Sequence, residues 1–348
     1  VWTSDQAFSW YNNQSWLVGC NFLPSSCINQ IEMFQEGTFN LKEIAKEISW
    51  AKSIGFNTIR VYLHDLLWEE KDQFLLRFND FLDCCQTHEI KPIIVLFDDC
   101  HYPFPELGPQ PLPVRGIHNS GWKQSPGHQI VTEIFEFNTK QHLVRLQRYT
   151  QELLELYKED GRILMWDLYN EPGQFGIGEK SYTFLKYVWN WAHEIRPSQP
   201  LTSCLDGSIG DSIISLNQSK SDIITFHTYE AEKLEPTIKE LRRIGRPLMC
   251  TEYMAREYGT TFEFCLPLFK KYNIACYNWG LVAGRSQTNF NWETILHLNE
   301  QRDAGNLIKE GDTLTEPNEW FHDIFRQDGS PYRNEETTFI KKILLNKE

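Results

Sequence analysis

The segment ILMWDLYNEPG, residues 163–173, is almost entirely apolar or aromatic until it reaches Asn170, Glu171 and Pro172. Such a run is typical of a buried strand in a parallel sheet. The acidic residue at its end belongs either to a solvated turn or to a catalytic site at the mouth of a barrel. The pattern of the remaining chain distinguishes these two interpretations.

Seven further apolar runs occur along the chain, separated by amphipathic stretches. We expect eight strands, at residues 16–22, 57–63, 91–97, 163–169, 201–204, 222–227, 247–251 and 274–279. Helical periodicity predicts helices at 41–54, 72–88, 141–158, 182–195, 236–244 and 260–272, a weak helix near 213–216, and a closing helix with its turn within 316–332. Alternation of this kind predicts an α/β fold, a single (β/α)8 TIM barrel.

A doubly wound sheet is the structural alternative, but no GxGxxG motif follows the first strand. No internal repeat or low-complexity linker divides the chain, so we expect one domain over residues 1–348. Two long connections, 98–137 and 280–318, each follow a strand. In a barrel both lie on the C-terminal face, where the enzymes of this fold keep their active sites.

Composition excludes several classes of protein. The chain has 348 residues, and its hydrophobic content of 41% supports a substantial core. The net charge of −13 argues against a nucleic-acid binder, whose affinity depends on Lys and Arg meeting phosphates. No run of about 20 apolar residues predicts a membrane span.

The sequence leaves the cellular compartment open. Nine cysteines is an odd number, so at least one is unpaired, and no CxxC motif suggests zinc or redox chemistry. A start at Val1 rather than Met is consistent with removal of an export signal and favours a secreted or periplasmic protein. Sequons at Asn13 and Asn217 arise too often by chance to decide the question.

Two glutamates follow predicted strands on opposite sides of the barrel. Glu171 follows the fourth strand, and Glu252, in RPLMCTEYMAR (residues 246–256), ends the seventh. Simple alternation places Asp167, Tyr169 and Glu171 on one face, and Pro172 favours an extended backbone at Glu171. A pair of facing carboxyl groups is the equipment for glycoside cleavage, in which one protonates the leaving oxygen and the other attacks the anomeric carbon.

With these motifs, the chain resembles the retaining glycoside hydrolases of clan A, around the cellulases, mannanases and xylanase-like enzymes of glycoside hydrolase family 5. The resemblance runs from WLVGCNF (residues 16–22) to IACYNWG (residues 274–280). It implies Glu171 as acid/base, Glu252 as nucleophile and Asn170 as a ligand of the sugar 2-hydroxyl. It also implies a carbohydrate substrate and a reaction that needs no metal or other cofactor.

Other positions match the family one at a time. Arg60 in NTIRVYL (residues 57–63) matches the arginine that holds the nucleophile, and we expect it to favour the ionised form of Glu252. His227 and Tyr229 in ITFHTYE (residues 224–230) match the His-x-Tyr of strand six, and Trp279 matches the tryptophan under the cleaved sugar. These residues are expected to bind the substrate or to position the carboxylates.

One strand end departs from the family pattern. LFDDC (residues 96–100) has Asp98 and Asp99 where many members have histidine, so the resemblance does not assign the polar contacts of the non-reducing sugar, and Asp98 is a candidate for substrate binding. In the following loop Asn119 and Trp122 are candidates for substrate contact, and Trp68 and Trp292 are further tryptophans at or beyond strand ends that could stack on sugars.

The same loop raises the question of a metal. His101, His118 and His128 occur in it, but their spacing lacks the i, i+4 pairing of a helical zinc motif, so we expect no metal site. Six prolines make the loop stiff, and we expect it to form a wall of the cleft.

Other functions remain open at this stage. A transglycosylase would use the same residues, and a non-catalytic carbohydrate-binding barrel would share the fold. An aldolase-type or isomerase barrel requires a Schiff-base lysine or a phosphate-binding glycine loop near strands seven and eight, and TEYMAR and YNWGLVAG provide no lysine there. The sequence decides neither the sugar, nor chain-end or mid-chain cleavage, nor the oligomeric state.

Overall fold

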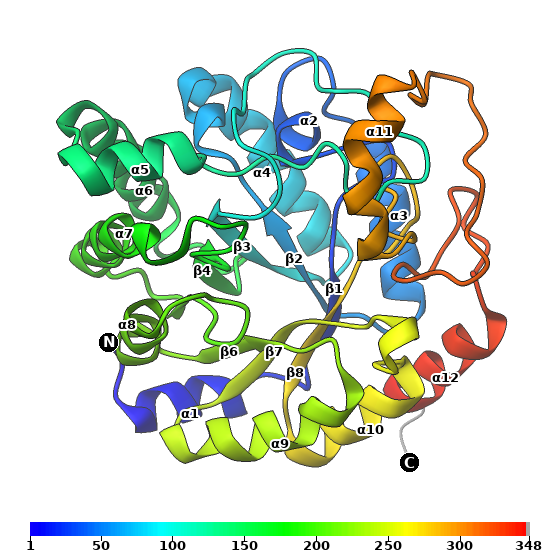
Figure 1. Ribbon diagram of the computed structural model, residues 1–348. Coiled ribbons are helices and arrows are strands. Elements are labelled where there is room, and N and C mark those ends of the chain that lie inside the picture. Colours follow the sequence, from blue (N-terminus) through cyan, green and yellow to red (C-terminus); the bar gives the residue numbers. More distant parts are fainter. Residues whose placement is uncertain (346–348) are drawn as a thin grey trace.

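The computed structural model describes residues 1–345 and contains one sheet of eight parallel strands (Figure 1). The strands are β1 (Val18–Asn21), β2 (Thr58–Tyr62), β3 (Lys91–Asp98), β4 (Met165–Asn170), β5 (Leu201–Thr202), β6 (Ile224–His227), β7 (Leu248–Tyr253) and β8 (Ala275–Trp279). Their order in the sheet is β5-β4-β3-β2-β1-β8-β7-β6. The edge strands β5 and β6 approach each other, since the Leu205 N–H donates to the Thr225 carbonyl at 2.9 Å. The sheet is therefore a nearly closed barrel.

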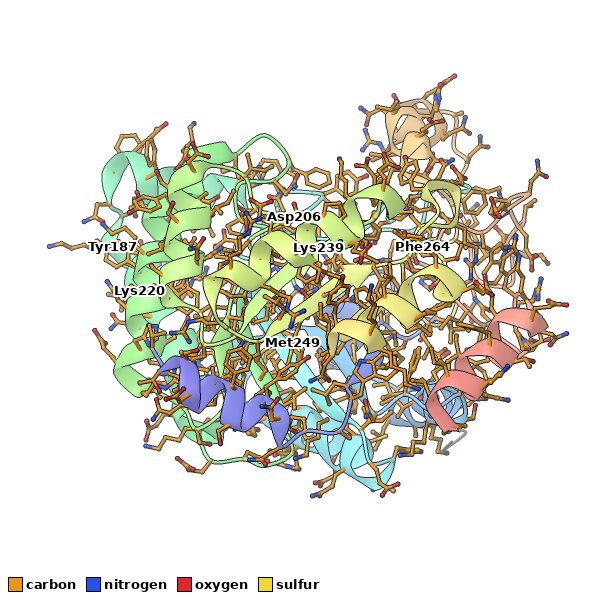
Figure 2. The ribbon with its side chains drawn as sticks, turned by 90° about the horizontal axis from the view of Figure 1, so that it is seen from below. Tyr187, Asp206, Lys220, Lys239, Met249 and Phe264 are labelled. Carbon is orange, nitrogen blue, oxygen red and sulfur yellow. The ribbon has the colours of Figure 1, made fainter. Side chains whose placement is uncertain are left out.

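Each strand is followed by a helix that covers the outside of the barrel. These helices are α3 (Leu41–Ser53), α4 (Lys71–Thr87), α6 (Lys140–Tyr157), α7 (Ser181–Ile195), α8 (Asp211–Lys220), α9 (Ala231–Leu241), α10 (Phe262–Tyr272) and α12 (Asn334–Leu345). The view from below in Figure 2 shows α9 and α10 side by side, marked by Lys239 and Phe264. The predicted (β/α)8 architecture is confirmed.

The helix α3 illustrates how local sequence forms these elements. Its N-terminus is capped by the Asn40 side chain, which accepts a hydrogen bond from the Glu43 N–H. Ile44, Ile48 and Ala51 recur at helical spacing and are fully buried. This apolar face packs on the barrel, as the periodicity predicts.

An additional helix, α1 (Ser4–Asn12), closes the bottom of the barrel. Its Tyr11 hydroxyl donates to the Asn273 carbonyl at 2.9 Å and accepts from the Ala275 N–H at 2.7 Å. Tyr11 packs with Met165 and Met249, which lie in the apolar lower layer of the barrel. Because apolar side chains fill this end of the barrel, we look for polar functional residues at the opposite, C-terminal end.

Several predicted elements are wrong in position. The segment 316–332 is not the closing helix, which is α12; Phe325 pairs with Pro331 across a turn that contains Gly329 at φ +84°, and a helix cannot form there. The connection 98–137 ends in a helix that was not predicted, α5 (His128–Phe137). Two short helices, α2 (Gln30–Phe34) and α11 (Leu298–Asp303), also lie in connections after strands.

Within residues 1–345, no helix is both long enough and apolar enough to span a membrane. All nine cysteines are free thiols, and every one except Cys84 is buried. The Asn217 side chain is fully buried and accepts a hydrogen bond from Trp189 at 2.9 Å, so this sequon has a structural role.

Candidate active site

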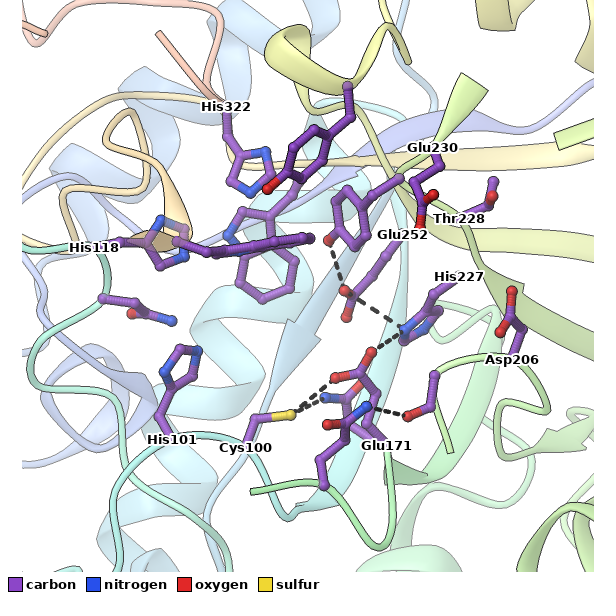
Figure 3. Close-up of a pocket in the computed structure, with 18 of the residues that line it drawn as sticks. Cys100, His101, His118, Glu171, Asp206, His227, Thr228, Glu230, Glu252 and His322 are labelled. Carbon is purple, nitrogen blue, oxygen red and sulfur yellow. Dashed lines mark hydrogen bonds and ion pairs between the residues drawn. The ribbon is translucent and has the colours of Figure 1, made fainter. Parts of the chain in front are cut away.

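A cavity of about 890 Å³ opens at the C-terminal end of the strands (Figure 3). The strand ends and the loops that follow β3 to β8 contribute its lining. Nine of the residues predicted for the site line it, namely Asp98, Asn119, Trp122, Asn170, Glu171, His227, Tyr229, Glu252 and Trp279. The tenth, Arg60, lies directly beneath and contacts two of them.

Glu252, near the end of β7, is held by four side chains. Arg60 and the Tyr62 hydroxyl each lie 3.0 Å from Oε1, and the Tyr229 hydroxyl donates to Oε2 at 2.7 Å. The fourth, His227, lies 3.5 Å from Oε2. Burial raises the pKa of Glu252, but His227, Arg60 and the two tyrosines lower it more, so the net pKa lies below its ordinary value. The carboxylate is therefore ionised near neutral pH.

Arg60 is fully buried and organises the floor of the site. Its Nη2 donates to Asp167 at 2.8 Å and to the Asn170 Oδ1 at 2.8 Å, and its Nη1 donates to Asn21 at 2.8 Å. Asp167 is also fully buried, so the guanidinium is paired with one structural carboxylate in addition to Glu252. This pairing balances the buried positive charge even when Glu252 is protonated.

Glu171 follows β4 and has an unusual backbone. Its φ is +43°, in the left-handed region, so the expectation of an extended conformation before Pro172 is wrong. The Gly173 N–H donates to the buried Asp99 at 2.7 Å and draws the chain into a tight turn, which overrides the local preference. Strain of this kind persists where the surroundings impose it, commonly at functional sites.

The Glu171 carboxylate has two donors. His227 Nδ1 lies 2.8 Å from Oε1, and the Cys100 thiol donates to Oε2 at 3.0 Å. Burial lowers the pKa of His227, but Glu252 and Glu171 raise it more, and the net pKa lies above its ordinary value. Burial and Glu171 raise the pKa of the Cys100 thiol well above its ordinary value, so it remains a protonated donor. Figure 3 shows His227 placed between the two carboxylates.

One oxygen of Glu171, one of Glu252 and a ring nitrogen of His227 lie within 4.8 Å of one another. In the described part of the chain, this is the only group of three or more such donors close enough to share a metal ion. His101, His118 and His128 form no such group there.

The end of β4 differs from simple alternation. Asp167 and Asn170 both contact Arg60 inside the barrel, whereas Tyr169 faces outward, packs on Phe184 of α7 and donates to Asp99 at 2.7 Å. The prediction that Tyr169 shares a face with Asp167 is therefore wrong. Leu168 and Tyr169 both face outward, and this break in the alternation points Asn170 toward the cavity.

Asp98, at the end of β3, is buried, and both of its carboxylate oxygens accept hydrogen bonds. Its Oδ1 accepts from the Asn170 amide at 3.0 Å and from the Cys100 N–H at 2.9 Å, and its Oδ2 accepts from Trp122 at 2.7 Å. Burial raises its pKa to about 7. Asp98 thus orients Asn170 and Trp122 in the wall of the cavity.

The remaining tryptophans separate into two groups. Trp122 and Trp279 lie edge to face at 6.3 Å, and Trp292 packs on Tyr229 at 4.9 Å, all against the cavity. Trp68 lies outside it, packs on Tyr149 at 5.7 Å and bonds to a helix glutamate, so its suggested sugar contact is wrong.

Three residues close to the two carboxylates were missed from the sequence. Tyr62 lies two positions after Arg60 on the same strand face, and this spacing is a signal that could have identified it. Cys100 and Gly207 lie close to Glu171 but belong to two other loops. Loops have no regular side-chain period, so no sequence pattern could have identified these two residues. A side chain at Gly207 would lie 2.8 Å from Glu171 Oε1 and 2.9 Å from His227 Nδ1.

Replacing Gly207 with alanine is therefore expected to displace Glu171 or His227 and to lower kcat on an aryl β-glycoside between about 10- and 100-fold. Gly207 has φ +104°, so backbone strain must be separated from this clash. Gly176→Ala is the matched control, since its φ is +83° and nothing lies within 4 Å of the added carbon. Equal kcat values for the two variants would contradict the expectation.

The sequence matches no protein-family model and no curated protein. Its structure is similar to an exo-β-1,4-mannosidase from Opitutaceae bacterium strain TAV5, with a TM-score of 0.63 and 15% identity over 94% of this chain and 59% of that one. It is also similar to an endo-β-1,4-mannanase from Thermotoga petrophila, with a TM-score of 0.58 and 14% identity over 96% of this chain and 77% of that one. For a glycoside hydrolase family 5 mannosidase from Rhizomucor miehei, the TM-score is 0.56 and the identity is 12%, over 94% of this chain and 92% of that one.

The chain thus spans about three fifths of the length of the Opitutaceae mannosidase and nearly all of the Rhizomucor enzyme. The likeness extends over the whole barrel, while sequence identity is low in each case. In its fold the chain is similar to the (β/α)8 mannosidases and mannanases of glycoside hydrolase family 5, the family that its motifs resemble.

Proposed function

We propose that the protein is a retaining β-glycoside hydrolase, with Glu252 as nucleophile and Glu171 as acid/base. The observation that supports this most directly is the approach of their carboxylate oxygens to within 4.8 Å. Retaining enzymes keep their two carboxyl groups about 5–5.5 Å apart, whereas inverting enzymes need about 6.5–9.5 Å to admit a water molecule. The separation supports a covalent, two-step reaction.

In the first step an oxygen of Glu252 bonds to the anomeric carbon while the glycosidic C–O bond breaks. Glu171 gives its proton to the departing oxygen, and a glycosyl ester remains on Glu252. In the second step the Glu171 carboxylate takes a proton from water, the water oxygen bonds to the anomeric carbon, and the ester bond breaks. The free sugar leaves, and both glutamates return to their initial states.

The other residues fit supporting roles in this scheme. Arg60, Tyr62 and Tyr229 hold the nucleophile ionised and oriented. Asn170, fixed by Arg60 and Asp98, is available for the sugar 2-hydroxyl. Trp279 offers a flat apolar surface for the C–H face of the ring.

Removing one donor from Glu252 is expected to shift the pH profile. Glu252 must be ionised to attack, so kcat/KM falls as pH drops through its depressed pKa. Tyr229→Phe deletes the 2.7 Å hydrogen bond and is expected to move this acidic limb to higher pH. Tyr258→Phe, which lines the same cavity, is the control. An unchanged acidic limb in Tyr229→Phe would show that the hydroxyl does not stabilise the reacting carboxylate.

A panel of p-nitrophenyl β-glycosides tests the proposal as a whole. The similar structures are named as mannosidases and mannanases, so we propose β-mannosides as the first substrates, followed by glucosides, galactosides and xylosides. Hydrolysis of at least one member, lost in Glu252→Ala, is the expected result. A protein that binds these sugars and releases no nitrophenol would instead be a carbohydrate-binding barrel.

A further inference from the structure

Two long loops close one end of the cavity. The loop between β3 and α5 and the loop between β8 and α12 meet through backbone hydrogen bonds (Figure 1). The Asn119 N–H donates to the Ser286 carbonyl at 2.7 Å, and the Arg115 N–H donates to the Asn306 carbonyl at 2.8 Å. Both contacts join segments that are more than 160 positions apart in sequence. We call this junction, residues 101–122 with 284–308, the loop wall.

Buried side chains fix the loop wall. Gln287, only 1% exposed, accepts from the Gly116 N–H at 2.8 Å and donates to the Val114 carbonyl at 2.7 Å. His118 Nδ1 donates to the Phe290 carbonyl at 2.7 Å. Burial lowers the pKa of His118 to about 4, so the ring is neutral in this position. These buried hydrogen bonds fix the two loops against each other.

Very little space remains at the base of the wall. Beyond the main cavity, a pocket of about 20 Å³ lies between Asn119, Trp122, Trp279 and Asp323. A single water molecule needs about 10–15 Å³ by a comparable measure. The small pocket beside Trp279 therefore cannot hold a second sugar ring.

The opposite end of the cavity is open. Asp206, Glu232 and Lys233 line it there and are exposed. Figure 3 shows Asp206, Thr228 and Glu230 on the side of the catalytic pair opposite His101 and His118. Because the loop wall closes the other end, a leaving group protonated by Glu171 departs toward this open end.

From this arrangement we infer that the protein removes single sugars from the non-reducing end of β-linked chains. The inference rests on the proposed function, because it uses Glu171 and Glu252 to orient the substrate. The sugar that carries the anomeric carbon lies over Trp279, and its far hydroxyls face the loop wall, where the next sugar of a longer chain would collide.

Asn119 is the group that reads the terminal hydroxyls. Its side chain is 1% exposed and lines both the main cavity and the small pocket. Its Oδ1 has no hydrogen-bond partner within the described part of the protein. A buried acceptor without a partner is costly, and a sugar hydroxyl supplies the missing donor.

The inference is tested with matched p-nitrophenyl glycosides of one sugar and of two β-1,4-linked sugars, with products resolved by chromatography. We expect direct nitrophenol release from the monosaccharide. The disaccharide should lose its terminal sugar first, with nitrophenol following after a lag, and a disaccharide that resists cleavage would overturn the inference. Immediate release of nitrophenol with an intact disaccharide would overturn the inference while leaving the proposed function in place. Absence of hydrolysis across the whole glycoside panel would contradict the proposed function, and the inference with it.

A substitution tests the role of Asn119 separately. Asn119 has φ +51°, which glycine adopts without strain, so Asn119→Gly removes the side chain and keeps the backbone of the wall. We expect kcat/KM on the monosaccharide glycoside to fall about tenfold, the effect of one lost hydrogen bond. Asn138→Gly is the matched control, since Asn138 has φ +48° and lies exposed at the end of α5. Equal kcat/KM in the two variants would remove Asn119 from the terminal-sugar site.

Discussion

Glu252→Ala is expected to lower kcat on an aryl β-glycoside about 10⁴-fold or more, because the covalent route loses its nucleophile. The fold should survive the change. Arg60, which would lose one partner, still bonds to Asp167 at 2.8 Å and to Asn21 at 2.8 Å. Steady-state kinetics, with circular dichroism to verify folding, measures the effect.

A small anion distinguishes the loss of a nucleophile from general damage to the site. Azide can enter the space left by the shortened side chain and attack the anomeric carbon from the same face as Glu252. We expect it to restore turnover of an activated aryl glycoside in Glu252→Ala and to give the glycosyl azide of inverted configuration. Glu240→Ala, an exposed acid on α9 that does not line the cavity, is the matched control and should retain wild-type rates. Equal losses in both variants would mean that Glu252 has no special chemical role.

Glu171→Ala is expected to act selectively on poor leaving groups. An alkyl glycoside needs its oxygen protonated as the bond breaks, so its kcat/KM should fall about 10³-fold. Dinitrophenolate departs from its glycoside without being protonated, so the first step with this substrate should be little affected. Comparison of kcat/KM across a series of leaving groups measures this difference.

The second step gives an independent control on Glu171. Without a base to activate water, the glycosyl ester should accumulate and appear as a burst of dinitrophenol before slow turnover. Equal losses of kcat/KM on good and poor leaving groups would contradict the acid role of Glu171.

Much of the barrel could be predicted from the sequence because its strands are buried on both faces and read as apolar runs. The strand that ends at Asn170 and the strand that contains Glu252 are examples, and the motifs at their ends place both carboxyl groups at one face of the barrel. Arg60, His227 and Tyr229 came from the family resemblance together with their strand positions.

The missed features depend on contacts between segments distant in sequence. The outward turn of Tyr169 follows from its hydrogen bond to Asp99 and its packing on Phe184, which no local period encodes. The left-handed backbone of Glu171 depends on the same loop, through the bond between Gly173 and Asp99. Cys100 likewise reaches Glu171 from a different strand end, and only the folded barrel brings them together.

The expected closing helix within 316–332 failed for a related reason. That segment contains apolar residues at plausible spacing, but its chain folds back so that Phe325 pairs with Pro331. Its buried Trp320 stacks on Tyr332 of the same segment, and its buried Phe321 packs on Trp292 at the cavity, so neither lies along a helix face. Apolar periodicity alone does not distinguish these two ways of burying aromatic side chains.

The central claim is that Glu252 forms a covalent bond to the sugar while Glu171 assists. It is tested most directly by incubating the protein with an activated 2-deoxy-2-fluoro β-glycoside of the sugar preferred in the panel, followed by mass spectrometry of the digested protein. We expect one added sugar, carried by the peptide that contains Glu252. A sugar attached to another residue, or rapid turnover with no labelled peptide, would contradict it.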